Sequence, residues 1–293
     1  MIAATGNGTA APLDAERLAA ALRGASRPRG RETPRGPETP RGLDTMWTDL
    51  RIVGATASTN TDVMRAAAAG ADEGLVLAAE FQTAGKGRQG RAWQTKPGAA
   101  LTFSVLLRPD DVPQAARGWL PLLAGVAAAR ALGRVTGLDA RLKWPNDVLV
   151  CGGKLAGILA EQAAGAVVVG IGINVLGTEH DLPVATATSL ERCGAGGADR
   201  TDLLGAILGE FELRYAAWRA TGHGDAEASG LRSEYLSLSA TVGRQVRVQL
   251  PADRELTGVA AGVDRAGQLL VVPPAGAPVV AVSAGDVIHV RPI

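Results

Sequence analysis

The 293-residue chain has few of the residues from which disulfide frameworks and metal sites are built. It contains two cysteines and three histidines. Because Cys151 and Cys193 are too few for a disulfide framework, we interpret them as reduced thiols, which favours a cytoplasmic protein. His180, His223 and His289 are scattered and never fall at the spacing of metal ligands. The sequence therefore predicts neither a zinc site built from protein side chains nor a histidine-based catalytic triad.

The chain also lacks long hydrophobic runs and an excess of charge of one sign. No stretch approaches 18 uncharged apolar residues, and the first residues carry neither a basic leader nor an apolar signal core, so we expect no membrane span and no secretion. Thirty basic and 29 acidic side chains give a formal net charge of +1, which requires no nucleic-acid partner. The length is sufficient for about two domains.

The first 48 residues differ in composition from the rest of the chain. Residues 14–23 have the pattern of one short helix with two leucines on one face. Pro-Arg-Gly then recurs between residues 28 and 42, where no apolar side chain is available for burial. Such a segment cannot offset the entropy cost of ordering, so it favours a flexible linker over a basic arm for an anionic partner. We expect the first 44 residues to be dispensable.

The remainder divides into a larger domain over residues 49–238 and a smaller one over residues 239–293. Short alternating runs separated by turns predict five strands in the smaller domain, arranged as a small antiparallel barrel and ending at Val290. The larger domain alternates strands and helices. Its predicted strands are 50–53, 75–80, 101–107, 142–144, 148–150, 155–161 and 167–173, and its predicted helices are 62–69, 120–132 and 201–218.

One loop combines three glycines with three cations: Gly85-Lys86-Gly87-Arg88-Gln89-Gly90-Arg91. Glycine lets the backbone approach an anion, while lysine and arginine supply charge, so the loop suits a phosphate-bearing ligand. The loop also matches the Gly-x-Gly-x-x-Gly pattern of dinucleotide-binding proteins, but turn-forming residues follow it where that pattern requires a helix. A P-loop is disfavoured because Leu155 follows Lys154, where serine or threonine should bind magnesium. A solvated basic loop remains the alternative.

Four further motifs each allow a structural and a functional interpretation. Ser58-Thr59-Asn60 suits either helix capping or a polar ligand head group. Lys143-Trp144-Pro145-Asn146-Asp147 and Gly153-Lys154 could be turns, and Gly170-Ile171-Gly172-Ile173-Asn174 could be a closely packed strand. Together with the glycine-rich loop they indicate an adenylating site, which needs cations for a triphosphate, oxygen ligands for Mg²⁺, a surface for adenine and a dry pocket for an acid.

Taken in order, these motifs resemble those of biotin protein ligases, and the resemblance covers Ile52 to Ile293. It implies an α+β fold, with a mixed-sheet catalytic domain related to class II aminoacyl-tRNA synthetases and a small SH3-like barrel after it. The family pattern of the loop is Gly-Arg-Gly-Arg-x-Gly-Arg. This chain has Lys86 at the first arginine, which keeps the charge but loses the planar guanidinium fork.

The resemblance also assigns roles to residues of this sequence. Lys154, Arg88 and Asp147 are implied as catalytic, with Asp147 steering or deprotonating the attacking amine. No metal site built from protein side chains is implied. The residues implied to bind biotin are Ser58, Thr59, Asn60, Gln82, Lys86, Gly87, Arg88, Lys154 and Gly157. The residues implied to bind ATP and the adenylate are Arg91, Trp93, Lys143, Asn146, Lys154 and Asn174.

The implied reaction is that of a carbon–nitrogen bond-forming ligase. Biotin and ATP, with Mg²⁺, give biotinyl-5′-AMP, and a lysine on the biotin carboxyl carrier domain of an acetyl-CoA, acyl-CoA or pyruvate carboxylase then takes the biotin. A lipoate or octanoate ligase or transferase of the same fold is the alternative. A bifunctional ligase and repressor needs a helix-turn-helix module, and residues 1–48 show one short helix, so specific DNA binding is not expected. Monomer and homodimer both remain open.

Overall fold

The larger domain is built on a seven-stranded mixed sheet. The computed structural model describes residues 10–25, 45–163, 165–182, 184, 186–250, 254–274 and 276–289. Strands β1 and β2 are parallel, and the other neighbouring pairs are antiparallel. In sheet order the strands are β1 (Asp49–Val53), β2 (Leu75–Ala79), β5 (Ala100–Leu107), β9 (Ala166–Asn174), β8 (Gly153–Ala163), β7 (Asp147–Val150) and β6 (Arg141–Lys143).

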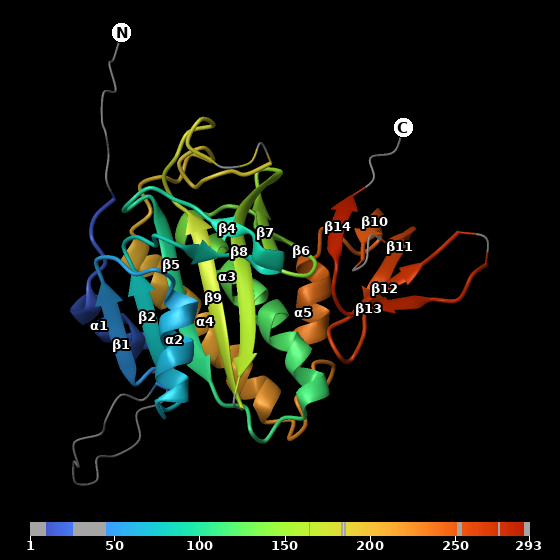
Figure 1. Ribbon diagram of the computed structural model, residues 1–293, viewed down its shortest axis with the longest axis horizontal. Helices are drawn as coiled ribbons and strands as arrows, with labels where there is room; N and C mark the ends of the chain where they lie inside the picture. The colour runs from blue at the N-terminus through green and yellow to red at the C-terminus, as the bar shows by residue number, and fades with distance from the viewer. Residues whose placement is uncertain are drawn as a thin grey trace, which may run out of the picture.

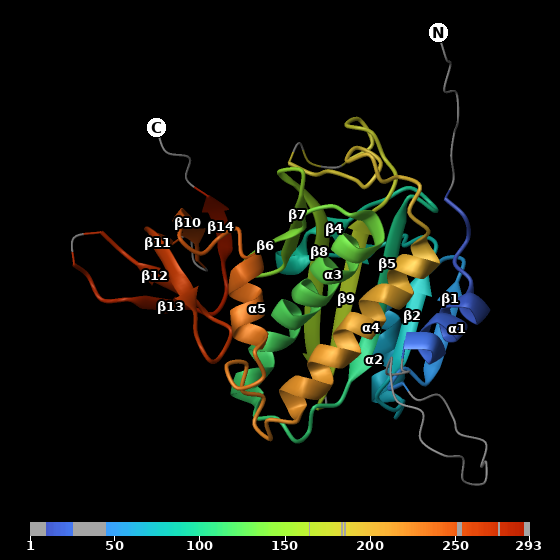
Figure 2. The same cartoon turned by 180° about the vertical axis from the view of Figure 1, so that it is seen from behind.

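Helices cover both faces of this sheet. α2 (Thr59–Ala68) lies on one face, and α3 (Leu120–Thr136) and α4 (Arg200–Arg219) lie on the other (Figure 1, Figure 2). Every residue of β5 and β9 is buried. This double burial explains why these strands are continuous apolar runs in the sequence, since neither face meets water.

The N-terminal helix is part of the main core. α1 (Ala15–Ala25) packs against α4, with Leu18 and Leu22 1% and 2% exposed. It extends two residues beyond the predicted end. The burial of these two leucines argues against the expectation that the first 44 residues are dispensable, as far as this helix is concerned. The Pro-Arg-Gly repeats lie outside the described residues.

The C-terminal domain is a five-stranded antiparallel sheet, as predicted. α5 (Leu231–Leu238) precedes it. Two tryptophans of the larger domain bind its backbone: the Trp144 indole N–H donates to Gly267 O at 3.0 Å, and that of Trp119 to Arg265 O at 3.0 Å. In sheet order the strands are β13 (Val280–Val282), β12 (Leu269–Val272), β11 (Glu255–Val263), β10 (Gln245–Gln249) and β14 (Asp286–His289).

Two details of the larger domain differ from the sequence expectations. α2 begins at Thr59, three residues before the predicted start, so that Thr59 and Asn60 belong to its first turn. The glycine-rich loop is a small hairpin of β3 (Gly85–Lys86) and β4 (Ala92–Trp93) around the 3-10 turn η1 (Arg88–Gly90), and a second 3-10 turn, η2 (Gln114–Trp119), precedes α3. In the part of the chain that the structure describes, every helix is too short or too polar to span a bilayer.

Candidate active site

A cavity of about 620 Å³ opens above β8 and β9. Its walls come from the start of α2, the glycine-rich loop, the turn before β7 and strand β14 of the C-terminal domain. All the predicted site residues line it: Ser58, Thr59, Asn60, Gln82, Lys86, Gly87, Arg88, Arg91, Trp93, Lys143, Asn146, Asp147, Lys154, Gly157 and Asn174. The fold thus brings together motifs separated by more than a hundred residues of sequence.

One end of the cavity is formed by buried, uncharged polar side chains. Ser58 occupies the N-cap position of α2, but its side chain makes no capping hydrogen bond. The helix is instead held from outside, because the Thr59 backbone N–H donates to Gln82 Oε1 at 2.8 Å. Ser58, Thr59 and Asn60 are only 2–4% exposed. Capping therefore does not account for Ser58, whose hydroxyl is available to a ligand.

Three residues absent from the predicted site orient Asn60. Ser104 Oγ lies 2.6 Å from Asn60 Oδ1 and 2.7 Å from Thr59 Oγ1. On the other side, Asn60 Nδ2 donates to Glu161 Oε2 at 2.8 Å and to Leu159 O at 3.2 Å. Because Glu161 and Leu159 accept only from the amide nitrogen, they fix which way the Asn60 amide faces. A serine inside the fully buried strand β5 was the signal that could have revealed this network.

The floor of the cavity is made of glycines. A Cβ on Gly170 would overlap Asn60 Oδ1. Gly157 and Gly172 are paired across β8 and β9, and the Trp93 indole lies against both: a Cβ on Gly172 would stand 2.5 Å from the ring and one on Gly157 3.3 Å away. These glycines are therefore required by close approach of other groups, the role that a strand glycine has where something packs tightly on the sheet.

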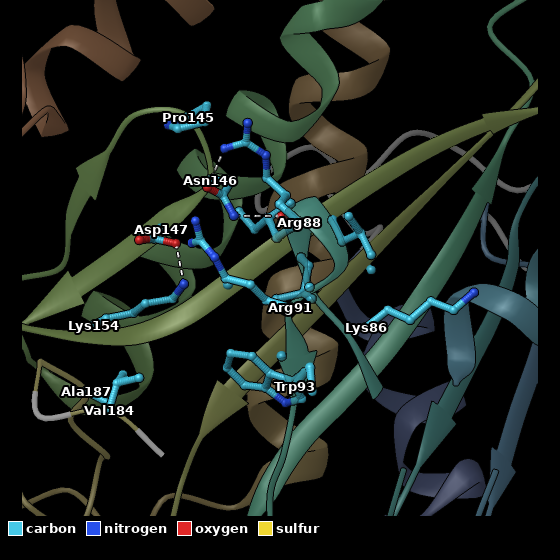
Figure 3. Close-up of a pocket in the computed structure, with 18 of the residues that line it drawn as sticks. Lys86, Arg88, Arg91, Trp93, Pro145, Asn146, Asp147, Lys154, Val184 and Ala187 are labelled. Carbon is cyan, nitrogen blue, oxygen red and sulfur yellow. Dashed lines mark hydrogen bonds and ion pairs between the residues drawn. The ribbon is translucent and has the colours of Figure 1, made fainter. Parts of the chain in front are cut away.

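The opposite end of the cavity is cationic. Lys154 Nζ forms a 2.6 Å ion pair with Asp147 Oδ1, and Arg88 Nη1 donates to Asn146 Oδ1 at 3.0 Å (Figure 3). Removal of water lowers the pKa of Lys143 below its ordinary value, and the neighbouring cations lower it further. Five cationic and two acidic side chains line the cavity. An anion with several charges would relieve this imbalance.

The C-terminal domain contributes to this end, which sequence reasoning missed. Arg91 forms an ion pair with Asp286, and Arg88 Nη1 donates to Gly285 O at 3.4 Å. Alternating residues in the tail indicated strands but gave no sign of which strand end would reach the loop. Lys86, in contrast, points away from the group formed by Arg88, Asn146, Asp147 and Lys154 (Figure 3), so it does not share their site for an anion.

Comparison with known proteins agrees with the fold and the site. The Biotin/lipoate A/B protein ligase family matches residues 54–177, and the biotin protein ligase C terminal domain matches residues 241–290. The biotin–[acetyl-CoA-carboxylase] ligase of Mycobacterium tuberculosis is 42% identical over 249 residues, which are 84% of this chain and 90% of that protein. The chain belongs to the biotin/lipoate A/B protein ligase family.

Two further relatives support the assignment. The biotin–[acetyl-CoA-carboxylase] ligase of Paracoccus denitrificans is 34% identical over 242 residues, which are 78% of this chain and 96% of that one. The structure of the biotin protein ligase from Aquifex aeolicus in complex with biotin and ATP has a TM-score of 0.70 at 26% identity, covering 83% of this chain and 99% of that one. The expected fold class, a mixed-sheet ligase domain followed by a small β domain, is confirmed.

Proposed function

We propose that this protein uses ATP to convert biotin into biotinyl-5′-AMP and then transfers the biotin to a lysine of a biotin carboxyl carrier domain. The observation that carries the proposal is the polarity of the cavity. Its buried end offers neutral hydroxyl and amide groups, which suit an uncharged ureido ring, and its other end offers cations, which suit a carboxylate and a triphosphate. An acid with a neutral polar head and a carboxylate tail fits between them.

In the first step the biotin carboxylate attacks the α-phosphate of ATP and releases pyrophosphate. Lys154 is proposed to offset charge on the reacting phosphate, and Arg88 to close the loop over the intermediate. In the resting site the two groups are held by Asp147 and Asn146. An arriving phosphate competes for both cations, so binding ATP would free the Asp147 carboxylate from Lys154.

In the second step a lysine amine attacks the carbonyl of the anhydride and AMP leaves. A lysine with a pKa of about 10.4 is mostly protonated at neutral pH, so the amine needs help to become a nucleophile. Asp147 is proposed to supply it, because it lies beside Lys154 and is released when Lys154 turns to phosphate. This order would keep the base occupied until ATP has bound.

Mg²⁺ is proposed to arrive with ATP. Among the described residues no group of three or more histidine, cysteine, aspartate or glutamate side chains could hold a metal ion. Mg²⁺ often needs only one or two carboxylates when phosphates and water supply the other ligands. Asp147, with the side-chain oxygens of Asn146 and Asn174 at the same end of the cavity, fits that smaller role, and the ion would neutralise charge on the triphosphate.

The partner is proposed to be the carrier domain of an acetyl-CoA, acyl-CoA or pyruvate carboxylase in the cytoplasm. The family includes lipoate enzymes, and lipoate or octanoate is therefore the alternative acid. The match of residues 241–290 to the biotin protein ligase C terminal domain favours biotin. So does the polar end of the cavity, because lipoate and octanoate have no hydrogen-bonding head group to satisfy it.

The test is pyrophosphate release from MgATP with biotin, lipoate or octanoate as the only acid. Of the three acids, we expect release with biotin only, and about a hundredfold slower release from a Lys154→Ala variant, which serves as the background control. Transfer is then followed by the mass of a purified carrier domain. Release with lipoate or octanoate but not biotin would contradict the proposal, and release without transfer to any carrier would contradict its second step.

A further inference from the structure

The two cysteines of the chain, 42 positions apart, meet in the structure beside the active-site lysine. Cys151 and Gly152 form the two-residue turn between β7 and β8, with φ values of 51° and 75°. Such turns favour asparagine or aspartate before glycine, and a cysteine with positive φ is uncommon. Cys151 is exposed. An unusual residue is therefore held in a strained conformation where small molecules can reach it.

Cys193 approaches this turn from a different segment. It lies in the loop that follows β9, half-buried, with its Sγ 3.5 Å from Thr188 Oγ1. The Thr188 side chain in turn lies against Gly153, where an added Cβ would stand 2.8 Å from Thr188 Cβ. Contact with the Cys193 thiol raises the pKa of Cys151 above its ordinary value. The two sulfur atoms are thus neighbours.

The same two segments hold the backbone of Lys154. The Lys154 N–H donates to Thr186 O at 2.7 Å, and the Thr188 N–H donates to Lys154 O at 2.9 Å. The two segments that carry the cysteines are therefore joined by a short ladder whose centre is the lysine proposed to contact the phosphate. Any covalent link between the cysteines would act directly on that ladder.

We propose that Cys151 and Cys193 form a reversible disulfide under oxidising conditions and that it displaces Lys154. The oxidant is a small disulfide. The exposed Cys151 thiolate attacks one of its sulfur atoms, which breaks the S–S bond and expels one thiolate. Cys193, as its thiolate, then attacks the Cys151 sulfur of the mixed disulfide and expels the second. The two cysteine protons end on the two released thiols, so the pair loses two hydrogens and the oxidant gains them.

The consequence for Lys154 follows from bond lengths. A disulfide bond is about 2.05 Å long, which is shorter than any contact between two separate thiols. Forming it pulls the turn toward the Cys193 loop. Gly153 already touches Thr188, so the strand start that carries Lys154 must shift. A misplacement of about 1 Å in a catalytic group can cost up to about a hundredfold in rate. This part rests on the proposed function.

The test incubates the full-length protein with oxidised glutathione. We expect the intact mass to fall by the two hydrogens lost, a Cys151–Cys193 peptide in a non-reducing digest, and a roughly tenfold slower biotin-dependent pyrophosphate release that dithiothreitol restores. Cys151→Ser and Cys193→Ser variants are the matched controls. Under reducing conditions, each variant should be about as active as the unsubstituted chain. With oxidised glutathione, neither variant should form the cross-link or slow its pyrophosphate release as the unsubstituted chain does.

Three results would overturn the proposal. The first is two glutathione adducts, or none, with no cross-linked peptide. The second is a cross-link that leaves pyrophosphate release unchanged. The third is a loss of activity on oxidation that is as large in the two serine variants as in the unsubstituted chain. Failure of the proposed function is seen separately, because it would abolish biotin-dependent release in the reduced, unsubstituted protein, whereas the mass measurement does not depend on activity.

Discussion

The two ends of the cavity are built in opposite ways. At the neutral end, Asn60 and Ser104 are 4% and 0% exposed and are joined by short hydrogen bonds between rigid elements. At the cationic end, the Arg91 and Lys154 side chains are 60% and 30% exposed and are held by ion pairs with Asp286 and Asp147. Buried hydrogen bonds are expensive to break, whereas exposed ion pairs are exchanged at little cost.

This difference assigns two tasks to two kinds of structure. The neutral end is fixed before any ligand arrives, so it can select a head group by matching hydrogen bonds. The cationic end must release its resting partners to accept phosphates and must let pyrophosphate leave. On the proposed function, recognition belongs to the buried neutral end and turnover to the ion-paired cationic end, and the predictions below test the two ends separately.

The largest effect should come from removing support beneath the neutral end. Glu80, two residues before Gln82, is tied to the N-terminal segment by the Leu13 N–H at 2.6 Å, and Leu18 of that segment is 1% exposed. Leu18→Ala should lower the free energy of unfolding by about 2–5 kcal/mol. Denaturant unfolding measures it. Exposed Glu16→Ala is the control, and equal stability of both variants would show that the segment is not part of the core.

Lys154→Arg should lower the rate of biotin-dependent pyrophosphate release about a hundredfold, close to the effect of alanine. A charge-assisted contact to a transition state is worth about 3 kcal/mol, and a planar guanidinium cannot reproduce the point contact of an ammonium group. Full activity of the arginine variant would overturn the proposed point contact, and full activity of the alanine variant would remove Lys154 from the reaction.

Gly170→Ala should raise the biotin KM about ten- to hundredfold with a smaller change in kcat, because the new Cβ displaces Asn60 and breaks a buried hydrogen-bond network. The matched control is Gly197→Ala, where a Cβ would meet no atom within 4 Å. Steady-state kinetics at saturating ATP distinguish the two. An unchanged KM in Gly170→Ala would mean that Asn60 does not bind biotin.

At the cationic end, Arg88→Gly should release biotinyl-AMP about tenfold faster and increase labelling of lysines outside the carrier, because the loop loses its contacts with Asn146 and Gly285. Arg88→Lys, which keeps the charge, should release biotinyl-AMP at a rate between those of the unsubstituted enzyme and Arg88→Gly. A pulse of radiolabelled biotin followed by a chase measures retention. If the glycine variant holds the intermediate as long as the unsubstituted enzyme does, the loop does not act as the lid.

The smallest effect is expected for Asp286→Asn, which removes the resting partner of Arg91. Stability should change by less than about 1 kcal/mol, since the pair is partly exposed. Proteolysis at residues 85–91 should nevertheless become faster without ligand and stay slow with biotin and MgATP. Asp139→Asn, which breaks an exposed pair with Arg141, is the control. A loop equally protected in both variants would mean that β14 does not restrain it.

Most of the fold could be predicted because it has local signals, and the site residues could be predicted from motifs that resemble those of a known family. Buried strands are continuous apolar runs, and loops that accept anions combine glycine with cations. The missed features depend on packing between distant segments. Nothing local to Glu161 indicates that it faces Asn60, and nothing in the tail indicates that Asp286 reaches Arg91. Burial of α1 was missed because two leucines on a short helix look too few to anchor it.

The indole of Trp93 on its glycine floor gives the protein an internal optical signal. The chain has five tryptophans, and the other four are at most 2% exposed. Trp93 alone is half-buried, and its indole N–H, which lines the cavity, has no hydrogen-bond partner among the described residues. A ligand that settles against the floor changes the surroundings of Trp93 most, because Trp144, which also lines the cavity, is only 2% exposed. Intrinsic fluorescence therefore reports occupancy of the site in real time, with no added dye.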